Sequence, residues 1–325
     1  MYRASRIGVM TAAAGLSVIV AAAQPPVTIV RDVRAAVACT DWPCTPKQDL
    51  SGGEAVLKEY RAAHGTTSET LEALSWLGRA ALAGGQLDKA FAYASETYEL
   101  AAAALKQKRL EDDARLETAL GAAIEVQAQV RAGRGQRSDA VYFLGRELEK
   151  YQGTPLHRRI QKNVHVLSLE GQPAPALQDG DFLGRPMPTP DQIRGKPVLL
   201  FFWAHWCPDC KAQAPILAKM LDRYGKDGLA IIAPTQRYGY TGRRTVRAAP
   251  DEERHHIEQV RDTSYPFLRN EPVPVSETNH TVYGVSTVPT LVLIDRLGVV
   301  RLYHPGNMTE KELGAAIESV LGSTD

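Results

Sequence analysis

The chain has 325 residues, more than a single domain usually has, so we expect two folded units. Its 44% hydrophobic and 23% charged residues exclude a disordered chain. The net charge of +1 argues against both a nucleic-acid binder and a strongly acidic scaffold.

Residues 1–23 have the pattern of a secretory signal peptide. Arg3 and Arg6 precede an apolar run at 7–20, and three alanines at 21–23 supply an A-x-A cleavage site. The run is rich in alanine and shorter than the roughly 20 residues of a membrane-spanning helix, which favours cleavage over retention as an anchor. We therefore expect an exported protein, periplasmic or otherwise extracytoplasmic, that contacts a membrane only if this segment is retained.

The four cysteines fall into two close pairs, Cys39 with Cys44 and Cys207 with Cys210. In an oxidising compartment an even number of cysteines can form disulfides. The first pair lies in a lead-in segment, 24–50, which contains several prolines and has no sustained hydrophobic period. Its spacing is too wide for a redox motif and no predicted strand precedes it, so a structural disulfide is favoured over a second redox centre.

Residues 51–168 predict an all-helical domain. The stretch 52–151 is rich in Ala, Leu, Glu, Lys and Arg and has almost no proline, a composition that favours helix. One helical stripe contains Leu87, Phe91, Ala94 and Tyr98. We expect amphipathic helices joined by short glycine-containing turns, as in helical hairpins.

Two turns in this segment resemble each other. Gly85-Gln86 is followed by Ala90, and Gly135-Gln136 by Ala140. Leu77-Gly78 lies upstream of the first turn, much as in a tetratricopeptide repeat, although the offset between the two turns is too long for that repeat's period. A repeat-like array that binds a protein partner and a generic helical bundle packed on the next domain both remain open.

Residues 169–325 predict an α/β domain, because strand-like and helix-like segments alternate. The continuous apolar run at 197–203 is typical of a buried central strand. We expect further strands at 229–233, 290–294 and 299–303, a hairpin around 181–184, and helices at 251–261 and 310–321.

A Cys-x-x-Cys motif, Cys207-Pro208-Asp209-Cys210, directly follows the central strand. Two cysteines three positions apart at the start of a helix lie on one face and can reach each other. The helix N-terminus favours a thiolate, and the first cysteine of such motifs has a pKa of roughly 3.5–7.5. We expect Cys207 to be the exposed nucleophile and the more buried Cys210 to resolve the mixed disulfide.

Two other interpretations of this motif are weaker. A zinc site would need further Cys or His ligands, and the sequence has no second C-x-x-C and no H-x-x-x-H. An inert disulfide is disfavoured by the position of the motif between a strand and a helix. We expect neither a metal nor a cofactor.

The motifs resemble the thioredoxin superfamily, and within it the exported, redoxin-type TlpA/ResA-like branch. The resemblance covers roughly residues 170–325 and rests on four matched stretches: 202–211 followed by Pro215, 284–290, 171–175 and 195–199. It implies a thioredoxin fold, with a central mixed sheet flanked by helices, and the activity of a protein-disulfide reductase. The partners it implies are a disulfide-containing client protein and an upstream thiol electron donor.

The resemblance also implies roles for residues around the motif. Pro289 should be a cis-proline facing the cysteine pair, since cis peptide bonds are essentially a proline feature. The backbone of Val288 would bind an incoming substrate strand, and Trp206 would shield the sulfurs. Pro208 and Asp209 complete the set of supporting residues.

One position departs from the family pattern. Cytosolic thioredoxins carry a buried acid where this sequence has Phe201, so proton transfer at Cys210 must use another group or water. Asp209 is a candidate, and its carboxylate would oppose thiolate formation and favour a reducing site. If Asp209 is exposed, solvent screens that effect.

Several alternatives stay open. A thiol oxidase or isomerase would use the same residues with the opposite redox poise. A peroxidase is disfavoured because no peroxidatic cysteine lies near Pro234. The helical half could instead act as an adaptor, and the long segment 235–282 could shape substrate access or be a solvated decoration.

Overall fold

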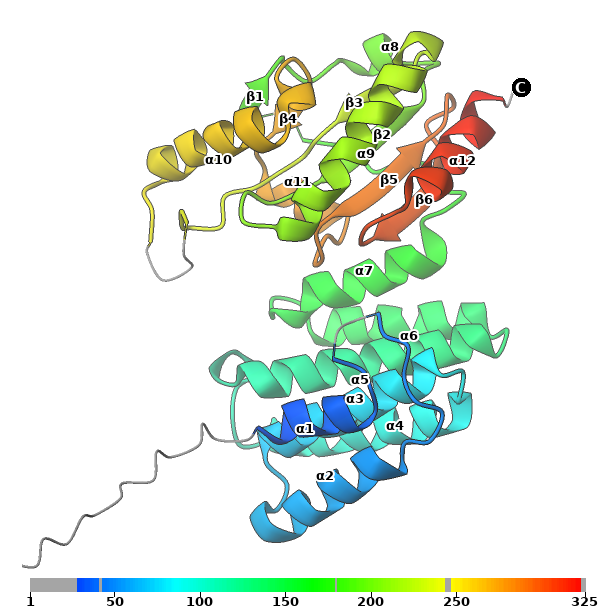
Figure 1. The fold of residues 1–325 in the computed structure, drawn as a ribbon, viewed down its shortest axis with the longest axis vertical. Coiled ribbons are helices and arrows are strands. Elements are labelled where there is room, and N and C mark those ends of the chain that lie inside the picture. The colour runs from blue at the N-terminus through cyan, green and yellow to red at the C-terminus, as the bar shows by residue number, and fades with distance from the viewer. Residues whose placement is uncertain (1–27, 41–42, 179, 243–246, 323–325) are drawn as a thin grey trace, which may run out of the picture.

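The computed structural model describes residues 28–40, 43–178, 180–242 and 247–322 (Figure 1). The predicted signal peptide at 1–23 lies outside these residues. Within the described part of the chain, no helix combines the length and the apolar character needed to cross a membrane.

The first half of the chain is helical, as predicted. Its elements are α1 (Ile29–Ala36), α2 (Ser51–His64), α3 (Ser68–Ala83), α4 (Leu87–Ala104), a 3-10 turn at Leu110–Asp112, α5 (Ala114–Gly133), α6 (Arg137–Lys150) and α7 (Leu156–Ser168). The helix α1 was not predicted within the lead-in segment. It buries Ile29, Val30 and Val33 against the helices that follow, and two helical turns are too short to produce a clear period in the sequence.

The two similar turns introduce equivalent helices. Gly85 precedes α4 with φ of 74°, and Gly135 precedes α6 with φ of 81°. This left-handed conformation is one that glycine adopts without steric cost. Ala90 and Ala140, in the first turns of α4 and α6, are fully buried, because the helices approach closely there. The sequence echo therefore marks the turns of two helical hairpins, α3–α4 and α5–α6.

The second half contains a four-stranded mixed sheet in the order β3-β2-β5-β6. The central strand β2 (Val198–Phe202) pairs in parallel with β3 (Ala230–Ile232) and antiparallel with β5 (Thr290–Ile294), which pairs antiparallel with β6 (Val300–Pro305). The predicted strands and the mixed sheet are confirmed. The remaining helices are α8 (Pro190–Ile193), α9 (Pro208–Tyr224), α10 (Pro250–Ser264), α11 (Glu277–Val282) and α12 (Glu310–Leu321), with 3-10 turns at Gly225–Asp227 and Pro266–Leu268.

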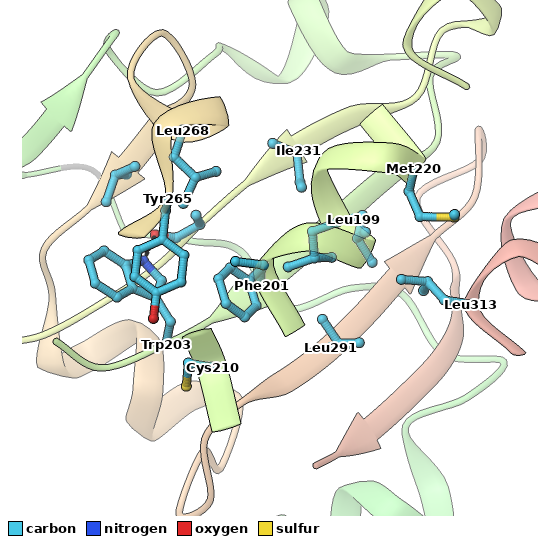
Figure 2. Packing of buried hydrophobic residues seen from close by; sticks show 14 of the residues in the cluster. Leu199, Phe201, Trp203, Cys210, Met220, Ile231, Tyr265, Leu268, Leu291 and Leu313 are labelled. Atoms are coloured by element: carbon cyan, nitrogen blue, oxygen red, sulfur yellow. Dashed lines mark hydrogen bonds between the residues drawn. The ribbon is translucent and has the colours of Figure 1, made fainter. Parts of the chain in front are cut away.

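Both faces of the sheet are covered. Alternate residues of a strand point to opposite faces, so Leu199 and Phe201 belong to one buried cluster, and Leu200 and Phe202 to another. Figure 2 shows the first cluster, in which sheet residues lie against side chains of α9 and α12. The second cluster lies on the face toward α11 and α7. This double burial explains the uninterrupted apolar run in the sequence.

The predicted hairpin around 181–184 is wrong. The strand β1 (Phe182–Gly184) instead pairs antiparallel with β4 (Pro272–Pro274), far along the chain. Gly184 has φ of 74°, and a Cβ there would lie 2.2 Å from the carbonyl oxygen of Glu271. The glycine that suggested a local turn is therefore required by this close approach to a distant segment.

Cys39 and Cys44 are joined in a disulfide, and Cys39 is fully buried. Closing a loop of this size is expected to stabilise the fold by about 2 kcal/mol. A Cys39→Ser/Cys44→Ser variant should therefore unfold at lower urea concentration than the native chain while keeping its thiol–disulfide activity. Urea titrations of both proteins, with Cys207 and Cys210 oxidised, measure the difference. Unchanged stability together with lost activity would instead indicate a second redox centre.

Candidate active site

The Cys-x-x-Cys motif lies at the beginning of α9, immediately after the loop that leaves β2. Cys207 is the N-cap residue of this helix and Pro208 is its first residue, a position where a missing backbone N–H costs nothing. The backbone N–H of Cys210 donates to the Sγ of Cys207 at 3.0 Å. The partial positive charge of the helix N-terminus thus points at the Sγ of Cys207 and favours its thiolate.

Cys207 and Cys210 are joined in a disulfide with a Cα–Cα distance of 5.3 Å. Cys207 is only 2% exposed and Cys210 is fully buried. The prediction that Cys207 is exposed is therefore wrong for this oxidised form. One side of its sulfur bonds to Cys210, and the segment before β5 covers another.

That segment carries the second motif. The Val288–Pro289 peptide bond is cis, as the resemblance implies, and the carbonyl oxygen of Val288 lies 3.5 Å from the Sγ of Cys207. The Thr290 hydroxyl donates to the carbonyl oxygen of Thr287 at 2.7 Å and closes the turn. Strands β5 and β2 are direct neighbours, and Phe202 at the end of β2 pairs with Thr290 at the start of β5. The fold therefore brings the two motifs together at the same end of these strands.

The residues flanking the cysteines differ in exposure. Trp206 is half-buried, and its ring packs edge-on against Tyr238 at 5.4 Å between centroids. Pro208 and Asp209 are exposed, so solvent screens the charge of Asp209. Trp203 is fully buried, and its Nε1 donates to the carbonyl oxygen of Ala233 at 3.1 Å.

A buried ionisable pair beside the motif was missed by the sequence analysis. The Nε2 of His205 lies 3.3 Å from a carboxylate oxygen of Glu253, and both side chains are 1% exposed. Glu253, from α10, also accepts the backbone N–H groups of Tyr238 and Gly239. Glu253 therefore fixes the loop whose Tyr238 packs against Trp206.

The environment of His205 opposes its protonation. Burial lowers the pKa of His205, and the nearby His256 lowers it further, whereas Glu253 opposes the shift. The Nδ1 of His205 has no hydrogen-bond partner among the described residues. The only sequence signal for this pair was a histidine directly before the motif tryptophan, because the position of Glu253 depends on the fold of the 235–282 segment.

Nothing in the described ranges brings three or more His, Cys, Asp or Glu side chains together in a way that could hold a metal ion. The chemistry that the described residues support is exchange between the Cys207–Cys210 pair and another thiol or disulfide.

Known proteins resemble the second half of the chain. The model of the AhpC/TSA family matches residues 171–303. The thioredoxin-like protein YneN of Bacillus subtilis is 31% identical over 163 residues, which cover 50% of this chain and 86% of YneN. The thiol-disulfide oxidoreductase ResA of Geobacillus thermodenitrificans is 29% identical over 152 residues, which cover 46% of this chain and 77% of that protein. The solution structure of a thioredoxin-like protein in the oxidized form is 23% identical, with a TM-score of 0.38. The match covers 49% of this chain and 99% of that protein.

Proposed function

This chain belongs to the family of thioredoxin-like thiol–disulfide oxidoreductases that includes YneN and ResA, and from this premise we propose that it reduces disulfides of client proteins through Cys207 and Cys210. The observation that carries the proposal is the position of this bonded cysteine pair. It caps α9 and lies against the cis-proline segment, with 3.5 Å between the Sγ of Cys207 and the carbonyl oxygen of Val288.

The proposed reaction has two exchange steps. The Cys207 thiolate attacks one sulfur of the client disulfide, forms a mixed disulfide and releases the other client sulfur as a thiolate, which takes up a proton. Cys210 then loses its proton and attacks the Sγ of Cys207, which releases the second client thiol and leaves the Cys207–Cys210 disulfide. Two electrons have passed to the client, and an upstream thiol donor must restore the dithiol.

The neighbouring residues support this sequence of steps. In this proposal the backbone of Val288 binds an extended client segment, Pro289 orients that segment, and Trp206 shields the sulfurs from water. Phe201 holds the place of the family's buried acid, so the Cys210 proton leaves to water or to Asp209, which lies one position away. Solvent screens the exposed Asp209 carboxylate, so its charge has little effect on the direction of the reaction.

The proposal also covers the cellular compartment of the protein and the division of its chain into domains. With residues 1–23 as a signal peptide, the protein acts in the periplasm or another extracytoplasmic compartment. We divide the mature chain into a lead-in at 24–50, a helical, tetratricopeptide-like domain at 51–168 and the redox domain at 169–325. The helical domain would contribute to partner binding.

The redox potential of the Cys207–Cys210 couple tests the direction of the reaction. We expect a value closer to about −270 mV, as in thioredoxin, than to about −120 mV, as in strong oxidants of the same fold. Equilibration with glutathione or dithiothreitol buffers, followed by alkylation and mass measurement, gives the potential. The reduced protein should also cleave insulin disulfides. A potential near the oxidising value would instead identify a thiol oxidase or isomerase.

A further inference from the structure

A cavity of about 790 Å³ lies between the helical half and the redox domain. Its walls come from α3, α5 and α7 on one side and from the segment before the cis-proline on the other. Ser286 and Thr287 belong to this second wall, and the next residue, Val288, touches the active-site sulfur. The cavity therefore opens beside the place where a client segment would bind.

The cavity carries an excess of positive charge. Four cationic side chains line it, Arg79, Arg158, Arg159 and Lys162, against the carboxylates of Glu117 and Glu125. Glu125 accepts from Arg159 at 2.9 Å and from Lys162 at 3.0 Å. Burial alone would raise the pKa of Glu125, but Lys162, Arg159 and Arg79 outweigh it and hold the pKa well below its ordinary value.

One buried carboxylate, Glu125, thus faces three cations, Arg79, Arg159 and Lys162. Burial, and after it the charge of Arg159, lowers the pKa of Arg79 to about 10. The part of this shift that comes from Arg159 is repulsion between two cations that line the same cavity. An anion entering the cavity would relieve this repulsion.

Arg158 connects the cavity to the active site. From α7 it donates to Glu277 at 2.8 Å and to the Thr281 hydroxyl at 3.4 Å, both in α11. The Glu277 side chain is 75% exposed, and exposed ion pairs of this kind are weak and readily exchanged. Burial raises the pKa of Tyr238, whose ring packs against Trp206, and the charge of Arg158 offsets part of that rise.

The helix α7 is held firmly against the redox domain (Figure 1). A Cβ at Gly284 would lie 2.7 Å from the backbone nitrogen of Lys162, so the two backbones touch where only glycine fits. The Nδ1 of His165 donates to the carbonyl oxygen of Tyr283 at 3.0 Å. The contacts at Gly284 and Tyr283 therefore fix the cations of α7 relative to the cis-proline segment.

We propose that this cavity binds acidic side chains of the client polypeptide, so that the helical half selects disulfides flanked by Asp or Glu. This inference rests on the proposed reductase function and names the class of client. An extended chain advances about 3.3 Å per residue, and the cavity wall at Ser286 and Thr287 directly precedes Val288. Acidic residues two or three positions from the client cysteine would reach it.

The test uses three peptides of one sequence, each with a single cysteine activated as a neutral thiopyridyl disulfide. The positions two and three residues from the cysteine on both sides carry Glu, Gln or Lys. The released thiopyridone reports the rate at which the reduced full-length protein attacks each peptide. We expect the Glu peptide to react roughly tenfold faster than the Gln peptide at low salt, and the Lys peptide to react more slowly than both. Added salt should reduce the preference.

Matched variants locate the selectivity in the cavity. Arg158→Gln should lower the ratio of Glu-peptide to Gln-peptide rates toward one, whereas Arg158→Lys should retain most of it. Glu117→Gln removes a negative charge from the lining and should raise the ratio. Arg223→Gln, at an exposed ion pair on α9 that does not line the cavity, should leave the ratio unchanged.

The outcomes separate this inference from the function on which it rests. If all three peptides react at equal rates, or if Arg158→Gln and Glu117→Gln leave the ratio unchanged, the acidic-client inference is wrong and the reductase function stands. If no peptide reacts, both proposals are overturned.

Discussion

Serine at position 207 is expected to abolish disulfide reduction, with a loss of at least about 1,000-fold in the rate of insulin cleavage, because no other sulfur can begin the exchange. Serine at position 210 should have a different effect. Cys207 can still attack the client, but the mixed disulfide then has no resolving thiol nearby and persists. The two variants should therefore look equally inactive in turnover and different on a non-reducing gel.

The measurement pairs insulin turnover with trapping. Cys210→Ser should retain a covalent client that dithiothreitol releases and mass spectrometry identifies, and Cys207→Ser should retain none. Alkylation of the reduced native protein at mildly acidic pH should label Cys207 first, because the helix N-terminus favours its thiolate. Preferential labelling of Cys210, or a trapped client on Cys207→Ser, would reverse the roles assigned to the two cysteines.

The parts of the fold that could be predicted are those whose pattern is local. The strand at 290–294 and the helix at 310–321 have the predicted bounds, since each has a strong period and clear end signals. The strand β1 was mistaken for half of a hairpin because three residues and a glycine do not specify a partner, and its partner β4 lies far along the chain. Helix α1 was missed because its 8 residues are also too few to give a clear pattern.

The candidate site likewise contains residues that local motifs predict and residues that only the fold brings together. The cysteine motif and the cis-proline segment could be found because each is a short local motif. The pairing of His205 with Glu253 could not, since it depends on how the 235–282 segment folds back over the motif. Likewise, Arg158 has an ordinary helical context in the sequence, and only the docking of α7 brings its charge to the active site.

A buried histidine outside the redox pair leads to the second large effect, a loss of stability in acid. The ring of His280 is fully buried and packs edge-on against Phe202 at 5.2 Å between centroids. Its Nδ1 lies 3.3 Å from the carbonyl oxygen of Ser276, and its Nε2 has no hydrogen-bond partner among the described residues. Burial lowers its pKa to about 3, the Ser276 carbonyl opposes this, and the charge of Arg158 adds to it.

The unfolded chain protonates this histidine near its ordinary pKa of about 6.5, whereas the folded chain does so only near 3. Between these values the unfolded state binds more protons, so the free energy of unfolding falls as the pH is lowered. The slope approaches about 1.4 kcal/mol per pH unit, and the total reaches roughly 5 kcal/mol near pH 3. Burial lowers the pKa of His165 and His205 as well, so these side chains act in the same direction.

Urea unfolding of the oxidised protein at several pH values between 7.5 and 4 measures this loss. His280→Leu removes the titrating group and fills a similar volume, so its stability should fall less steeply with acid, even if it is lower at neutral pH. His255→Gln, at an exposed histidine of α10, should leave the slope unchanged and serves as the control. Equal slopes for the native protein and His280→Leu would mean that the folded state accommodates a charge at this position, and the burial argument would fail. A shallower slope would show that the packing of α11 against Phe202, on the sheet face opposite α9, limits the acid range in which the redox site stays assembled.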